Sequence, residues 1–114
     1  MQVNKGELLL VYNADRLSDR TTYGYAKGLK NFVLKSIDVN KSILTELQII
    51  EFAKKLGIPL RRLLDSTYET GSIADKDVPK LLLNNPEMMK TPIVIFHDSA
   101  EFVHSPFHLL SKLN

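Results

Sequence analysis

The 114-residue sequence contains no cysteine. This absence excludes disulfide bonds, thiolate metal sites and any reaction in which a sulfur atom of this chain attacks a substrate. The N-terminal apolar run, Leu8 to Tyr12, is far too short to span a membrane or to form the core of a signal peptide. We therefore expect a cytoplasmic protein that does not associate with membranes.

The charges are nearly balanced, with 15 Lys and Arg residues, 13 Asp and Glu residues and a net charge of +2. Proteins that bind nucleic acid usually carry a denser basic face, so we expect no direct contact with nucleic acid. The sequence also lacks a phosphate-binding loop, a Ser/His/Asp arrangement and a pair of carboxylates at a recognisable catalytic spacing. No known catalytic motif stands out.

The composition is that of an ordinary globular protein, with 44% hydrophobic and 25% charged residues. A chain of this length can bury a core without disulfides or metal ions. We therefore predict a single domain over residues 1–114.

Four apolar segments are predicted to be strands. The continuous run from Glu7 to Tyr12 is typical of a central strand that is buried on both faces. Residues Asn31 to Val39 form a second candidate. Ile93 to Phe96, directly after Pro92, and Glu101 to Val103 are close enough in sequence for an antiparallel hairpin.

The clearest predicted helix begins at Thr45. Thr45 and Gln48 match the capping box, in which each side chain accepts a hydrogen bond from a backbone N–H near the helix start. Gly57 is placed to end this helix. Its apolar stripe is predicted to comprise Leu47, Ile49, Ile50, Ala53 and Leu56.

The other predicted helices rest on weaker local signals. Ser18 to Leu29 contains two glycines, each of which costs about 1 kcal/mol relative to alanine inside a helix. A further helix is predicted from Asp75 or Asp77 to Asn84. A last one begins after Ser105 as the N-cap, with Pro106 at its first position.

The order of these elements predicts an α/β protein with a mixed four-stranded sheet, β-α-β-α-β-β-α, and an inserted helical segment. The first two strands, linked by a helix, should be parallel with a right-handed crossover. The last two should complete the sheet as an antiparallel hairpin. This is the thioredoxin-like arrangement.

The segment "LLLNNPEMMKTPIVIF" resembles the arsenate reductase and Spx family of thioredoxin-like proteins. That family has a leucine-rich helix, Asn-Pro, a hydrophobic turn and Arg-Pro-Ile-Val ahead of the hairpin. The matching positions are Leu81 to Leu83, Asn85, Pro86, Met88, Met89 and Pro92 to Val94. The resemblance implies a cis peptide bond between Thr91 and Pro92.

The departures from the family pattern remove its chemistry. The family's first strand ends in a motif like Tyr-His-Asn-Pro-x-Cys-x-x-Ser-Arg, and alignment through Asn13 puts Arg16 at the cysteine position and Arg20 at the arginine. Two further family arginines fall on Thr91 and Asp65. Thiolate attack on arsenic needs sulfur, so we expect no catalytic residue and no enzymatic activity of the family type.

The candidate ligand-binding residues surround the start of the first helix and the proline: Asn13, Arg16, Arg20, Thr91 and Pro92. A helix N-terminus favours anions, so the two arginines suggest a retained site for an oxyanion or for a glutathione carboxylate. The alternative is that Asp15 and Asp19 neutralise both arginines in a solvated surface network.

Two groups of side chains carry open alternatives of their own. His104 and His108 are four residues apart, but a helix that begins between them makes a metal pair unsuitable, and we expect no metal site. Tyr12, Tyr23 and Tyr25 suit either the lining of the vacated groove or ordinary packing, which is the commoner use.

Two functions are compatible with these residues. The first is a non-catalytic module that binds a protein partner, as the resemblance to the Spx branch, which binds RNA polymerase, implies. The second is binding of glutathione or a small oxyanion in the old groove. Neither requires a cofactor of the chain's own.

Overall fold

The computed structural model describes residues 2–68 and 73–113. Its strands are β1 (Glu7–Tyr12), β2 (Val33–Asp38), β3 (Ile93–Ile95) and β4 (Ala100–Phe102). They form one sheet in the order β2-β1-β3-β4, in which β1 and β2 are parallel and the other two pairs are antiparallel. The predicted mixed four-stranded sheet with a terminal hairpin is confirmed.

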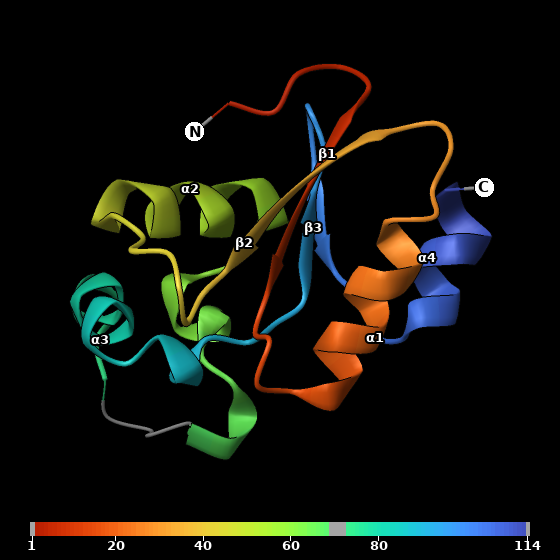
Figure 1. Cartoon of the computed structure of the whole chain (residues 1–114). Coiled ribbons are helices and arrows are strands. Elements are labelled where there is room, and N and C mark those ends of the chain that lie inside the picture. Colours follow the sequence, from red (N-terminus) through yellow and green to blue (C-terminus); the bar gives the residue numbers. More distant parts are fainter. Residues whose placement is uncertain (1, 69–72, 114) are drawn as a thin grey trace.

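Helices cover both faces of this sheet (Figure 1). The α-helices are α1 (Leu17–Ala26), α2 (Glu46–Leu56), α3 (Val78–Asn84) and α4 (Pro106–Leu113). Short 3₁₀ segments are η1 (Leu60–Leu63), η2 (Ser66–Tyr68), η3 (Asp75–Asp77) and η4 (Pro86–Met88). α1 and α4 lie on one side of the sheet, and α2 and α3 lie on the other. The predicted helical insertion thus corresponds to the segment between α2 and β3.

Element boundaries differ from the predictions by one to three residues. α1 begins at Leu17 and ends at Ala26 rather than at Leu29. It ends early because the N–H of Gly28 donates to the Tyr25 carbonyl (3.0 Å) and the N–H of Leu29 to the Ala26 carbonyl (3.1 Å). These tighter three-residue bonds close the last turn of the helix.

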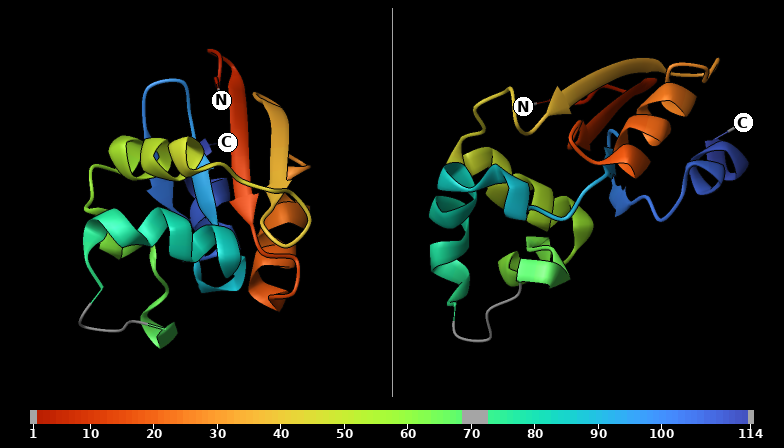
Figure 2. Two further views of the ribbon diagram at one scale, coloured as in Figure 1. Left: turned by 90° about the vertical axis from the view of Figure 1, so that its left-hand side faces the viewer. Right: turned by 60° about the horizontal axis from the view of Figure 1, so that its bottom comes forward.

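The sheet separates two apolar cores. Leu9 and Val11 of β1 belong to the core under α2, whereas Leu8 and Leu10 belong to the core under α1 and α4. All four are buried, as predicted for a central strand. Figure 2 shows α2 lying across one face of the strands. The strand that leads to the candidate site is therefore held from both sides.

The predicted capping box of α2 is confirmed. The N–H of Gln48 donates to Thr45 Oγ1 (3.1 Å), and the N–H of Thr45 donates to Gln48 Oε1 (2.9 Å). Gly57 ends the helix with a φ of 70°, a left-handed conformation that favours glycine. The prediction that Leu47 belongs to the apolar stripe is wrong, because Leu47 is 72% exposed. At about 100° per residue it points about 160° away from the buried Ile49.

The tyrosines pack instead of lining an open groove. The rings of Tyr12 and Tyr23 stack with centroids 4.8 Å apart, and both pack against the core under α1 and α4. The ring of Tyr25 packs against that of Phe107 in α4, with the ring centroids 5.9 Å apart. Burial is the main reason why the pKa of Tyr12 is raised, and the neighbouring Tyr23 and Asp38 raise it further. The packing alternative holds for these three rings.

Candidate functional site

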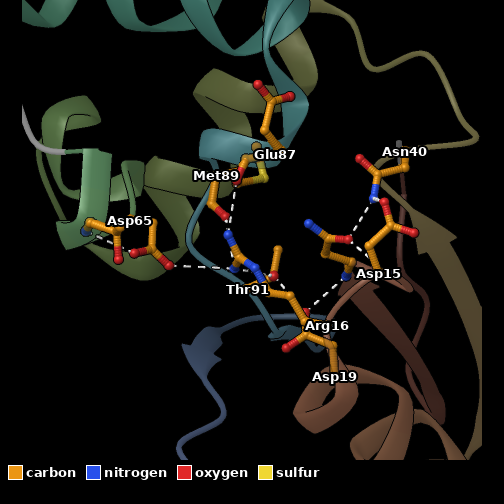
Figure 3. Close-up of polar contacts among 10 residues, drawn as sticks. Asp15, Arg16, Asp19, Asn40, Asp65, Glu87, Met89 and Thr91 are labelled. Carbon is orange, nitrogen blue, oxygen red and sulfur yellow. Dashed lines mark hydrogen bonds and ion pairs between the residues drawn. The ribbon is translucent and has the colours of Figure 1, made fainter.

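The candidate site lies where the chain leaves β1 and turns into α1. Arg16 is the N-cap residue of α1, and the Thr91–Pro92 peptide bond, which is cis, enters β3 beside it. β1 and β3 are hydrogen-bonded neighbours, so the two segments meet at the same end of the sheet. Figure 3 shows the side chains that gather there.

Arg16 points away from its own helix and into this junction. Its Nη1 donates to Thr91 Oγ1 (3.0 Å) and to the Met89 carbonyl (3.3 Å), and its Nη2 donates to the Glu87 carbonyl (2.9 Å). Nη1 also lies 3.4 Å from Asp65 Oδ2, and both side chains are 25% exposed. The guanidinium is thus bound by acceptors of its own chain (Figure 3).

A short backbone pairing of two loop segments positions Asp65 beside Arg16. Leu64 and Met89 form an isolated antiparallel bridge. The N–H of Asp65 donates to the Met88 carbonyl (2.8 Å), and the N–H of Lys90 donates to the Leu63 carbonyl (2.7 Å). This pairing holds the Asp65 carboxylate and the Glu87 and Met89 carbonyl groups within reach of the guanidinium.

The Asp65 carboxylate is stabilised in its charged form. The backbone N–H of Thr67 donates to Asp65 Oδ1 (2.9 Å) and is the main reason why the pKa of Asp65 is lowered. Burial is the next largest influence and raises this pKa, whereas the Thr67 side chain and then the positive charges of Arg16 and Lys90 lower it further. Asp65 therefore keeps its negative charge to a lower pH than an ordinary aspartate.

A buried carboxylate joins β1 to β3 beneath Arg16. Asp19, which is only 1% exposed, accepts a hydrogen bond from the Asn13 N–H (2.8 Å) and another from the Thr91 hydroxyl. The hydroxyl of Thr91 therefore accepts from Arg16 and donates to Asp19. The expectation that Asp19 neutralises the arginines on a solvated surface is wrong, because Asp19 lies in the interior and Arg16 forms its ion pair with Asp65.

Asn13 is also buried, and its side chain organises the turn. Its Oδ1 accepts from the N–H of Asp15 (2.9 Å) and from the Asn40 side chain. Arg20 turns outward and donates to the Ala14 carbonyl (2.8 Å). The structure therefore brings Asn13, Arg16 and Thr91 into one network with Asp19, and directs Arg20 elsewhere.

Sequence reasoning missed three members of this network, namely Asp19 as a buried acceptor, Asp65 as the ion partner and Asn40. A signal for Asp65 was present in the resemblance. An arginine at the expected thiol position and an aspartate at an expected arginine position are opposite charges, and such a pair suggests mutual contact. Asp19 and Asn40 carry no comparable signal, because their roles depend on burial.

Over residues 2–68 and 73–113, no group of three or more acidic or histidine side chains is placed to hold a metal ion. His108 Nε2 lies 3.1 Å from Glu101 Oε1, and its ring meets that of His104 edge-on at 5.9 Å. In the same described residues, no helix combines the length and apolar composition needed to cross a bilayer.

Neither a protein-family model nor a curated protein sequence matches this chain. Solved structures do. An arsenate reductase from Vibrio cholerae superposes with a TM-score of 0.76 at 14% identity, over 95% of this chain and 98% of that chain. A Yersinia pestis protein assigned as an arsenate reductase gives 0.76 at 16% identity, over 92% and 99%. A Bacteroides fragilis protein related to the ArsC family gives 0.74 at 12% identity, over 97% and 100%.

These similarities define the fold class. The chain has the thioredoxin-like fold of arsenate reductases over nearly its whole length. It has this fold without any cysteine. Because one fold hosts many functions, what the site can do must be argued from its own side chains.

Proposed function

We propose that this chain is a non-catalytic, cytoplasmic module that binds a protein partner through an arsenate reductase-like fold. One observation carries the proposal. The side chain at the start of α1 is an arginine whose guanidinium is bound to Glu87, Thr91 and Asp65. A site arranged in this way supplies no thiolate, and its polar groups already satisfy one another.

Exposed apolar side chains support the choice of a protein as partner. Ile43 is 96% exposed, and Leu47 in the first turn of α2 is 72% exposed. Ile43 and Leu83 line a cleft of about 130 Å³ with Val39 and Pro86. Exposed apolar groups beside a concave surface are typical of protein–protein contacts. We expect the partner to insert an apolar side chain here.

A pull-down from an extract of the source cells tests this proposal. Immobilised wild-type protein should retain a saturable partner, and Ile43→Asp should lose it, because a carboxylate at the rim opposes apolar contact. Phe107→Asp is the matched control, since Phe107 is also 70% exposed but lies in α4. Absence of any saturable partner, or equal loss in both variants, would contradict the proposal.

A turnover assay tests the non-catalytic part. The purified protein should show neither arsenate reduction nor disulfide reduction, because both need a thiolate that the chain lacks. The assay should contain glutathione and glutaredoxin to supply an external thiol, and the rate of the same mixture without this chain should be subtracted. Robust turnover above that background would overturn the proposal.

Binding of glutathione or a small oxyanion is the alternative function. We expect no such binding at this site, because Arg16 and Arg20 donate to acceptors of their own chain. Titration with glutathione, phosphate and arsenate, followed by amide chemical shifts, tests it. Saturable shifts over residues 13–20 and 91–93 would favour the alternative.

A further inference from the structure

We propose that residues 63–65 and 87–91 form a binding site for guanidinium groups, and that in this chain the occupant is the Arg16 side chain. We call these residues the guanidinium site. Its acceptors are the carbonyl oxygens of Glu87 and Met89, Thr91 Oγ1 and Asp65 Oδ2. The ligand class is an alkylguanidinium cation. This inference goes beyond partner binding and does not depend on it.

The arrangement of acceptors matches a planar, forked donor. Glu87 O lies 2.9 Å from Nη2, while Thr91 Oγ1 and Met89 O lie 3.0 and 3.3 Å from Nη1. A guanidinium presents its N–H groups in a fixed fork, whereas an ammonium is a compact point charge. One carboxylate, Asp65, balances the single positive charge at 3.4 Å. Three acceptors surround Nη1, and Glu87 O needs a second donor nitrogen, Nη2. A guanidinium supplies both nitrogens, whereas an ammonium supplies one, so the site favours guanidinium.

The Asp65 side of the site is held in place without Arg16. The backbone of Asp65 is fixed to Met88 and that of Lys90 to Leu63 by hydrogen bonds of 2.8 and 2.7 Å. The carboxylate itself is oriented by the Thr67 N–H at 2.9 Å. None of these bonds involves the guanidinium, so they should persist when it is removed.

The Thr91 side is held independently as well. The Thr91 hydroxyl donates to Asp19, and Asp19 is itself fixed by the Asn13 N–H. That hydroxyl therefore presents its lone pairs toward Arg16. The carbonyl of Glu87 belongs to η4, whose end is closed by a hydrogen bond from Met89 N–H to the Pro86 carbonyl (3.1 Å). The acceptors thus form a preorganised set.

The charges at the site disfavour anions. Asp65 contacts the guanidinium and the buried Asp19 accepts from the Thr91 hydroxyl, so two carboxylates serve the site, and the carbonyl oxygens add negative partial charge. Lys90, whose charge also acts on Asp65, has its ammonium 4.6 Å from the centre of the Phe102 ring. Removal of Arg16 would therefore leave a site that attracts cations. The site has the opposite electrostatic preference from the anion site that its position suggested.

Arg16 is tethered beside the site, so its effective concentration there is high. A free guanidinium compound at millimolar concentration should consequently not displace it. Deletion of the Arg16 side chain converts this intramolecular contact into a vacancy that a free ligand can fill. The wild-type chain therefore serves as an occupied control.

The test is chemical rescue of Arg16→Ala. Methylguanidinium chloride, titrated at millimolar concentrations far below those that unfold proteins, should raise the Tm of this variant in a saturable way. Amide shifts should move at residues 65–67 and 87–91. Ethylammonium chloride should give a clearly weaker response, and sodium phosphate should give none. Wild type and Arg20→Ala should not respond to methylguanidinium. Adding Asp65→Asn to Arg16→Ala should weaken binding about tenfold.

A missing response in Arg16→Ala, an equal response to ethylammonium, or the same response in Arg20→Ala would overturn the proposal. If Arg16→Ala does not fold, recovery of its folded spectrum by methylguanidinium supports the site. Arg16→Lys is the second variant for that case. It keeps the charge but not the fork, and stability equal to that of wild type would overturn the guanidinium selectivity.

Discussion

The N-cap side chains of α1 and α2 are used in opposite ways. Thr45 of α2 and its partner Gln48, three residues later, satisfy each other's backbone N–H groups. Arg16, the N-cap of α1, makes no such cap and reaches instead to residues 71 to 75 positions away in sequence. One helix start is completed by its own sequence, whereas the other is used to connect distant segments.

α1 can have an N-cap residue that does not cap the helix, because the carboxylate of Asp19 stabilises the turn before it. Asp19 lies in the first turn of α1, where the macrodipole favours an anion. Its carboxylate accepts from the N–H of Asn13, which precedes the helix. The turn is tightened by a bond from the Arg16 N–H to the Asn13 carbonyl (3.0 Å). Arg16 is thus free to bind elsewhere.

Among these changes, Arg16→Ala should have the largest effect on the free energy of unfolding. It removes three hydrogen bonds from a charged donor and leaves Asp65 without its ion partner, so we expect a loss of about 2 to 3 kcal/mol in the free energy of unfolding. Arg20→Ala, which removes one exposed hydrogen bond to the Ala14 carbonyl, should cost less than about 1 kcal/mol. Urea unfolding measures both. Equal losses would show that Arg16 contributes no more than an ordinary surface arginine.

Thr45→Ala should come next, with a loss of about 1 kcal/mol, because it removes the N-cap acceptor of α2. Hydrogen exchange should show faster opening of the first turn of α2 without an effect on α1. Thr21→Ala is the matched control. Thr21 lies inside α1 and donates back to the Leu17 carbonyl, so alanine there should be neutral or slightly stabilising. A loss in the control as large as in Thr45→Ala would contradict a specific cap effect.

Acid should weaken the Arg16 connection more gently. The pKa of Asp65 is lower in the folded chain than its ordinary value. The Thr67 N–H lowers it most, burial opposes this, and the Thr67 side chain, Arg16 and Lys90 lower it further. Its stabilising effect is therefore complete above the unfolded pKa of about 4 and is lost as the pH falls through the folded value. Wild type should lose about 1 kcal/mol or less relative to Asp65→Asn between about pH 6 and pH 3. Parallel pH profiles of unfolding free energy would contradict this.

Leu47→Gln should have the smallest effect. Leu47 is mostly exposed and lies on the face of α2 opposite Ile49, so the change should stay within about 0.5 kcal/mol. Ile49→Val, a much smaller change in shape, should cost about 1 kcal/mol because Ile49 is fully buried. If Leu47→Gln cost more than Ile49→Val, the orientation of α2 would need revision.

The fold could be predicted because its signals are local. The capping box at Thr45, the apolar run that became β1 and the short spacing of the last two strands each depend on residues close in sequence. Leu47 shows the limit of this approach. Its apolar character fits a stripe, but only the helical phase relative to Ile49 decides that it faces solvent.

The site could be predicted only in part because its contacts are long-range. The sequence identified Arg16 and Thr91 as candidates, and the structure joins them directly. No sequence pattern indicated that Asp19 is buried, because an aspartate in the first turn of a helix is usually exposed. The partner of Arg16 was reachable only by considering Asp65 as its complement in charge.

The stacked rings of Tyr12 and Tyr23 have a practical consequence for following this molecule. The chain contains four tyrosines and no tryptophan, so tyrosine dominates its absorption above about 270 nm. Two rings 4.8 Å apart couple their transitions and should give a near-ultraviolet circular dichroism band that neither gives alone. Tyr12 ends β1 and Tyr23 lies on α1, so the band reports whether α1 is docked against the sheet. The chain carries an optical reporter of the very turn that holds Arg16.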